Sequence, residues 1–151
     1  MESTLKTWKT SRKIFLNFLN SYSIEQLNRV PPGFNNNLIW NIGHVIVVQQ
    51  LLVYKGSGLP AYVSNELIER YKPGSRPLTE ITQAEVDELK ELLISLIAKT
   101  ETDLSNGIFS SYHERTTTTG FHLATVEDAV VFNNFHEGMH LGYLMSIRKL
   151  V

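Results

Sequence analysis

The side chains best suited to chemistry in this 151-residue chain are its five histidines, because it contains no cysteine. Two of them stand four residues apart in His136-Glu137-Gly138-Met139-His140. On a helix, this spacing places both imidazoles on one face about one turn apart, where they can bind one metal ion. The same letters satisfy H-E-x-x-H, the pattern of zinc metalloproteases, in which the glutamate is the general base. The pattern therefore has two interpretations, a protease site or another kind of metal site.

The residues after His140 disfavour the protease interpretation. In metalloproteases of this type, the third zinc ligand is a His or Glu on the C-terminal side of the motif. The segment Leu141–Val151 contains no His, Asp or Glu. We therefore expect the third ligand to come from upstream.

His44 is the best candidate for the third ligand. It shares one helical stripe with Trp40, Val47 and Leu51. A single histidine on an apolar face is more often a packed core residue than a ligand. The two histidines near the C-terminus change this expectation, because they also occupy a stripe of core positions. Burying imidazoles without partners costs free energy, whereas a metal ion shared between facing helices would satisfy all three.

The other polar candidates have less defined roles. Glu137 points about 100° away from its neighbour His136 on a helix, which favours a surface or supporting salt bridge. The base role that glutamate has in zinc proteases stays open, so no catalytic residue is assigned. His113 and His122 lie in the loop Ser110–Ala124 and are expected to be structural or exposed. The alternative for these two histidines is a fourth metal ligand or a substrate contact.

Four segments with helical spacing must position these side chains. A capping box, Thr82-Gln83-Ala84-Glu85, begins the third helix, and Thr125 followed by acidic residues begins the fourth. We predict an all-α fold: a four-helix bundle in one domain spanning residues 1–151. A long crossover connects helices 2 and 3 and includes a short helix at about 66–71. The four predicted helices cover approximately residues 3–19, 37–54, 82–106 and 125–148.

The composition disfavours several functional classes. The net charge is −1, and charged residues make up 19% of the chain without a basic cluster, which disfavours nucleic-acid binding. Neither a signal peptide nor a membrane-spanning apolar run is visible, so a cytoplasmic protein without a membrane partner is expected. Without cysteine, any metal must be held by His, Asp or Glu.

Three motifs in this chain resemble those of the DinB-like superfamily, a group of small four-helix proteins considered to be metalloenzymes. They are Trp40-x-x-Gly43-His44, Lys72-Pro73-Gly74-Ser75-x-Pro77 and His136-x-x-x-His140-x-Gly142. The resemblance implies that His44, His136 and His140 form a metal triad that binds a divalent ion, zinc or nickel. It also implies a homodimer. Tyr143 replaces the Gln that many relatives have after the last glycine, so any role of that Gln is in doubt here.

These observations predict a metal-dependent enzyme that is either a hydrolase or a transferase using a low-molecular-weight thiol. The substrate would be a small molecule or a thiol. Three histidines leave a coordination position open, which is typical of catalytic rather than structural zinc sites. We expect a cavity above the metal, walled by the loops Pro31–Asn37 and Ser110–Ala124. The alternative is a non-catalytic metal-binding or interaction module, for which a sealed site with four protein ligands is expected.

Overall fold

The computed structural model describes all residues, 1–151, and its fold is all-α. Six α-helices and one 3-10 helix account for most of the chain, and the only sheet has two strands of two residues each. The elements in chain order are α1 (Glu2–Ser21), α2 (Ile24–Asn28), α3 (Leu38–Val53), η1 (Lys55–Ser57), α4 (Asn65–Tyr71), α5 (Gln83–Ser105), β1 (Arg115–Thr116), β2 (His122–Leu123) and α6 (Val126–Ile147).

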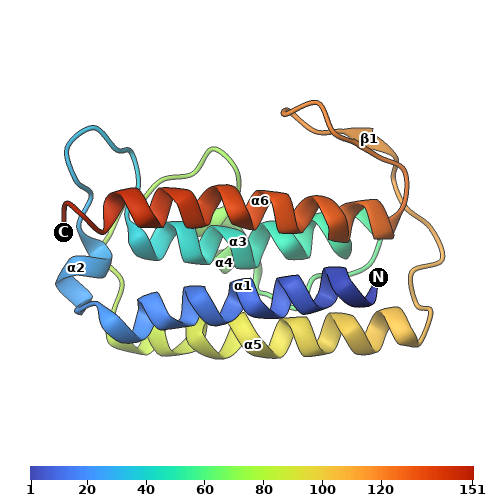
Figure 1. The fold of residues 1–151 in the computed structure, drawn as a ribbon, viewed down its shortest axis with the longest axis horizontal. Helices are drawn as coiled ribbons and strands as arrows, with labels where there is room; N and C mark the ends of the chain where they lie inside the picture. The colour runs from blue at the N-terminus through green and yellow to red at the C-terminus, as the bar shows by residue number, and fades with distance from the viewer.

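The four long helices lie side by side, as Figure 1 shows. Helix α1 packs against α5 and α6, and α3 packs against the same two helices. Helices α1 and α6 run in one direction, and α3 and α5 run in the opposite direction (Figure 1). Because α3 and α5 are parallel, the chain must return along the molecule between Val53 and Gln83, and α4 lies in this connection.

Side-chain caps explain where the long helices begin. The Asn37 side chain accepts a hydrogen bond from the backbone of Trp40 at the start of α3. Capping boxes begin α5 at Thr82 and α6 at Thr125, each with a carboxylate at the third helical position. A further box at Ser23 begins the five-residue helix α2, which the sequence analysis did not predict.

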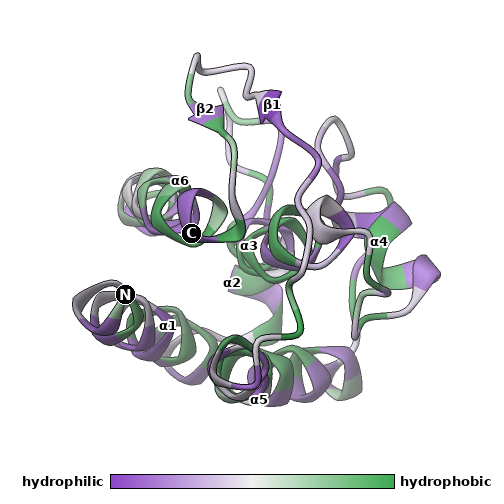
Figure 2. Ribbon diagram, turned by 90° about the vertical axis from the view of Figure 1, so that its right-hand side faces the viewer, coloured by the Kyte–Doolittle hydropathy of each residue, from purple (hydrophilic) through white to green (hydrophobic).

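The core has two apolar clusters of buried side chains with a polar layer between them. On α1, Arg12 separates Trp8 of one cluster from Phe15 of the other. On α6, the polar layer occupies the turns from Asn133 to His140. Helix α3 passes through the centre, and Figure 2 shows its mostly hydrophobic residues enclosed by the other elements. Polar side chains in the middle of α3 are therefore buried as well.

The strands β1 and β2 form a short antiparallel hairpin beside the N-terminal part of α6 (Figure 1). Both strands lie within Ser110–Ala124, which the sequence predicted to be a loop. Gly120 has a φ angle of 89°, a left-handed conformation that allows the chain to turn back. None of the helices combines the length and apolar character needed to cross a membrane.

Candidate metal centre

His44 of α3 and His136 and His140 of α6 converge in the polar layer. Their potential ligand atoms all lie within 4.8 Å of one another. The ring centroids of each pair are 4.6–5.3 Å apart. The structure thus brings together the three histidines selected from the sequence. No Asp or Glu belongs to this group.

The His44 ring is fixed on two sides. Its Nδ1 atom lies 2.6 Å from the carbonyl oxygen of Tyr71, at the end of α4. A carbonyl can only accept, so Nδ1 carries the proton and donates, which leaves the lone pair on Nε2. The ring also stacks on Trp40 at a centroid distance of 4.6 Å. Ligating histidines usually hold their second nitrogen in this way.

His140 is oriented by Asn41, one turn before His44 on α3. The His140 Nδ1 atom lies 2.8 Å from Asn41 Oδ1. The Asn41 amide nitrogen donates to the backbone oxygen of Asn37 and to the side chain of Asn36, which fixes which end of the amide faces the imidazole. His140 therefore donates through Nδ1 and keeps the lone pair on Nε2.

His136 has no such partner within the protein. Its Nδ1 atom is buried and makes no hydrogen bond. An unpaired buried polar atom costs free energy, and a metal ion bound by this imidazole would offset the cost. Two oriented imidazoles and one unpartnered imidazole form a donor set suited to zinc or another divalent transition metal.

The electrostatic environment keeps these imidazoles neutral. Burial lowers the pKa of His136 to about 3, and the neighbouring His44 and Arg12 add to this effect. Burial also lowers the pKa of His140 to about 3, with further contributions from His136 and His44. Burial lowers the pKa of His44, against the opposing effect of its Tyr71 hydrogen bond. Neutral imidazole is the form that binds metals, so the site is ready for an ion at neutral pH.

A pocket of about 460 Å³ opens over the three histidines. Its other walls come from the C-terminal half of α3, from α6, from Pro73 and from the hairpin residues 115–119. The loop Ser110–Ala124 thus contributes to the wall, as predicted. The loop Pro31–Asn37 does not, because the walls above the histidines are formed by helices and the hairpin instead.

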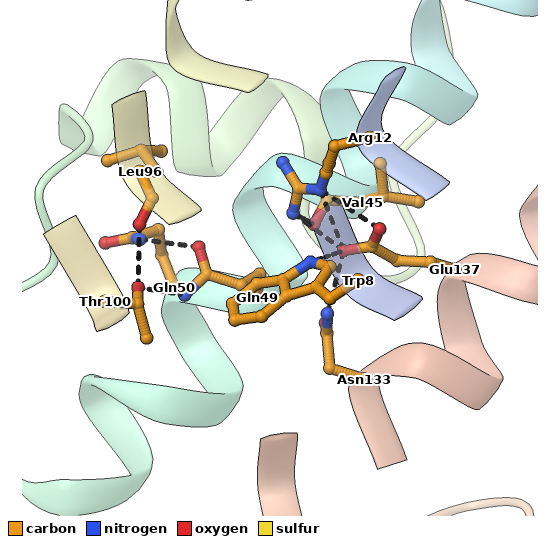
Figure 3. Close-up of polar contacts among 9 residues, drawn as sticks. All are labelled: Trp8, Arg12, Val45, Gln49, Gln50, Leu96, Thr100, Asn133 and Glu137. Atoms are coloured by element: carbon orange, nitrogen blue, oxygen red, sulfur yellow. Dashed lines mark hydrogen bonds and ion pairs between the residues drawn. The ribbon is translucent and has the colours of Figure 1, made fainter. Parts of the chain in front are cut away.

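Glu137 lies in a separate buried cluster on the adjacent side of α6, which faces α1. Its carboxylate accepts hydrogen bonds from Trp8 Nε1 at 2.8 Å and from Asn133 Nδ2 at 2.8 Å (Figure 3). The guanidinium of Arg12 binds the same carboxylate through Nε and Nη2, at 2.7–3.0 Å. Arg12 Nη2 also donates to the backbone oxygen of Val45 on α3. Both charged side chains are fully buried.

This cluster assigns Glu137 a structural role. Its carboxylate is held by three side chains from α1 and α6, and Glu137 does not line the pocket above the histidines. A general base must reach a proton of the substrate, directly or through one water. The salt-bridge interpretation of Glu137 therefore fits the structure, and the protease-like role does not.

A second polar chain, also visible in Figure 3, joins α3 to α5. Gln50 donates to Gln49 at 2.7 Å, and Gln49 donates to Thr100 at 3.2 Å. Thr100 in turn donates to the backbone oxygen of Leu96. These contacts satisfy amides that the apolar surroundings of α3 would otherwise leave unpaired.

The remaining histidines lie apart from the centre. His113 and His122 are exposed, and His122 pairs with Glu114 at 3.2 Å. Neither belongs to the three-histidine group, so no fourth histidine ligand is present. Tyr143 is also exposed, with its ring centroid 6.1 Å from that of His140.

The glycines near the histidines differ in their surroundings. A Cβ atom on Gly43 would lie 2.5 Å from the ring of Tyr71, so this glycine permits the close approach of α4 to α3. By contrast, Gly138 and Gly142 face outward and a Cβ atom there would meet nothing within 4 Å. Of these three glycines, only Gly43 permits close packing of two elements.

The residues that orient the histidines were not predicted from the sequence. Asn41 precedes His44 by three positions on the same helix, and a polar residue there in an apolar run was a usable signal. Tyr71 acts through its backbone oxygen, which no sequence pattern identifies.

An all-α fold with three clustered histidines from two facing helices defines a class of helical proteins equipped for metal binding. Within that class, a sequence profile of the DinB superfamily matches residues 7–144, so this chain belongs to the DinB superfamily. No curated protein matches the chain. A similar solved structure is described as that of a conserved protein from Enterococcus faecalis, with a TM-score of 0.68 and 17% identity. The match covers 99% of this chain and 95% of the other, and at this identity it supports the fold alone.

Proposed function

We propose that this protein is a divalent-metal-dependent enzyme acting on a small molecule, with His44, His136 and His140 holding zinc or nickel. The observation that carries the proposal is the open pocket above three neutral imidazoles that have no carboxylate among them. A sealed site with four protein ligands, which would favour a structural role, does not fit this arrangement. In this proposal, the four long helices act as a four-helix bundle that holds the ligands from facing helices.

When bound, such an ion lowers the pKa of a water or thiol molecule in its open position. The residues of the chain supply the rest. Tyr71 and Asn41 hold two imidazoles in fixed orientations, and apolar residues of α3 and α6 form one wall of the pocket. No Asp or Glu lines the pocket, so it offers no carboxylate base. We therefore favour a transferase that uses a low-molecular-weight thiol, with hydrolysis as the second activity.

Metal analysis tests the ligand assignment. The untagged protein is expected to contain about one divalent ion per chain, and the triple variant His44→Ala/His136→Ala/His140→Ala is expected to contain none. The double variant His113→Ala/His122→Ala is the matched control and should retain the ion. Absence of metal from the wild type, with no thermal shift on adding zinc or nickel, would contradict the proposal.

Activity measurements then separate the functions. Turnover of chlorodinitrobenzene with a small thiol would support the transferase, and turnover of nitrophenyl acetate would support the hydrolase. Metal at full occupancy, with neither reaction faster than in the triple variant, would favour the non-catalytic alternative.

The outer face of α6 supports the homodimer. Between Val131 and Ser146, its exposed positions carry no charged side chain. Two large apolar residues are exposed there, Val131 at 56% and Phe135 at 44%. Uncharged exposed faces of this kind mark contact surfaces. Phe135→Glu is expected to convert a dimer into a monomer in analytical ultracentrifugation. Ile94→Glu on α5, at the same 44% exposure, is the control. The predicted cytoplasmic location stays a prediction.

A further inference from the structure

The pocket above the histidines contains one side chain with a fixed charge, Arg115. Its apolar wall comes from α3 and α6, and the hydroxyl-bearing residues Thr116–Thr119 form the opposite side. No Asp, Glu or Lys lines it. The apolar wall residues are Val48, Leu51, Leu52, Phe132 and Met139.

The register of the hairpin explains why Arg115 lines the pocket. Arg115 lies directly opposite Leu123, and side chains of directly opposed residues project from the same face of an antiparallel pair. Leu123 is buried against the helices, with 2% exposure, so this face is directed toward the bundle. In the adjacent pair, Thr116 also lines the pocket, whereas His122 does not.

The charged side chains of the hairpin differ in whether they have a partner of opposite charge. Glu114 pairs with His122 at 3.2 Å. Arg115 makes no ion pair with any carboxylate of the chain, although Glu114 is its neighbour in sequence. The exposed guanidinium lies near the Tyr112 hydroxyl. No carboxylate of the chain occupies its donors, which are available to a molecule that enters the pocket.

We propose that Arg115 binds a carboxylate of the substrate, whose apolar body lies against the wall formed by α3 and α6. This inference rests on the proposed function, because it places the reacting end of the substrate at the three histidines. A planar guanidinium matches a carboxylate with two parallel hydrogen bonds. A single cation suits a monoanion, and the threonine hydroxyls add neutral donors beside it. The volume of about 460 Å³ lies within the range of small-molecule sites.

The test compares two probes of equal shape, phenylbutyrate and phenylbutanol, by isothermal titration calorimetry of the full chain. The wild type is expected to bind the carboxylate about 10-fold more tightly than the alcohol, because hydrogen bonds to charged groups are the stronger ones. In Arg115→Gln, this preference should disappear while the affinity for phenylbutanol is unchanged. Arg29→Gln, the same substitution at an exposed arginine outside the pocket, should keep the preference.

Equal affinities of the wild type for both probes, no binding of either probe, or a preference that survives in Arg115→Gln would each overturn the inference. The titrations are run on zinc-loaded and on metal-free protein. A preference that depends on Arg115 in metal-free protein supports the carboxylate subsite even if the metal analysis contradicts the proposed function. If the titrations contradict the carboxylate subsite while the protein still contains metal, the proposed metal site is unaffected.

Discussion

Two buried polar clusters meet on consecutive residues of α6, and they satisfy their polar groups in opposite ways. His136 belongs to a cluster of neutral imidazoles in which a buried nitrogen has no protein partner and a pocket opens above. Glu137 belongs to a cluster in which a carboxylate is saturated by Trp8, Arg12 and Asn133. The first arrangement leaves an imidazole available to an external ligand beneath an open pocket. The second uses its carboxylate to join α1 to α6, although Arg12 Nη1 and Asn133 Oδ1 in this cluster also lack partners.

The difference shows how to interpret H-E-x-x-H in this chain. The letters are adjacent in sequence, but the side chains of His136 and Glu137 serve two sites on different sides of the helix. A motif defines a site only when its side chains reach the same place.

The largest effect should come from breaking the Glu137 cluster. Glu137→Gln leaves the charge of Arg12 buried without a counter-ion, so we expect a loss of about 3–5 kcal/mol in the free energy of unfolding, measured by urea denaturation. Glu101→Gln, which removes an exposed pair with Lys9, should change it by no more than about 0.5 kcal/mol. A loss below about 1 kcal/mol in Glu137→Gln would contradict the structural role.

The histidine cluster should make the metal-free protein sensitive to acid. The pKa values of His136 and His140 are lowered to about 3 on folding, whereas in the unfolded chain they are close to 6.5. Below pH 6.5 the unfolded state binds more protons, so stability is complete above this pH and is lost as the pH falls toward 3. Between pH 7 and pH 5 we expect a loss of up to about 4 kcal/mol for the two groups.

Urea titrations at several pH values of protein stripped with a chelator check this expectation. His113→Gln, at an exposed histidine, should keep the same pH profile. A stability that stays constant from pH 7 to pH 5 would show that the imidazoles of the cluster protonate without cost.

A smaller effect is expected from a substitution that displaces Tyr71, the hydrogen-bond partner of His44. In Gly43→Ala, the new methyl group meets the ring of Tyr71, whose carbonyl oxygen orients His44. Overpacking of this kind costs about 1–3 kcal/mol, and we expect zinc affinity to fall together with stability. Gly142→Ala is the control, because its methyl group meets nothing and should stabilise α6 by up to about 1 kcal/mol. Similar changes in both variants would refute the specific role of Gly43.

The smallest effect should follow from removing the hydrogen bond between His140 and Asn41. Asn41→Ala removes the acceptor of the His140 Nδ1 proton, and loss of such a supporting partner lowers metal affinity by about 10-fold or more. A chelator competition titration with zinc measures this change. Asn36→Ala, which removes only a contact to the Asn41 amide, should stay near the wild-type affinity. If both variants bind zinc as the wild type does, Asn41 does not orient the ligand.

The elements that the sequence predicted well are those specified by local signals. The capping boxes at Thr82 and Thr125 and the helical spacing behind them place α5 and α6 within a residue or two of their observed bounds. The short helix α2 carries an equally local signal, the box from Ser23 to Gln26, and its omission was avoidable. Local signals thus predicted α6, which carries two of the three histidines.

Contacts between distant segments could not be predicted in the same way. Arg12 and Glu137 are 125 positions apart, and nothing in either neighbourhood specifies the pairing. The place of Arg115 in the pocket depends on the pairing of β1 with β2, which is set by burial of Leu123 against the helices. The convergence of His44 with the pair on α6 was predictable because the types and helical positions of these residues restrict how they pack.

The buried hydrogen bonds and ion pair of Glu137 also affect the orientation of the whole helix α6. Between Val131 and Ser146 its outward positions carry uncharged residues, so hydrophobic patterning alone defines only weakly which side of the helix turns inward. The Glu137 carboxylate meets its counter-ion in only one rotation of the helix about its axis. Any other rotation would leave a buried charge unpaired, which costs free energy. We expect the buried ion pair of Glu137 with Arg12 to fix the rotation of α6, so that His136 and His140 face α3 before an ion binds.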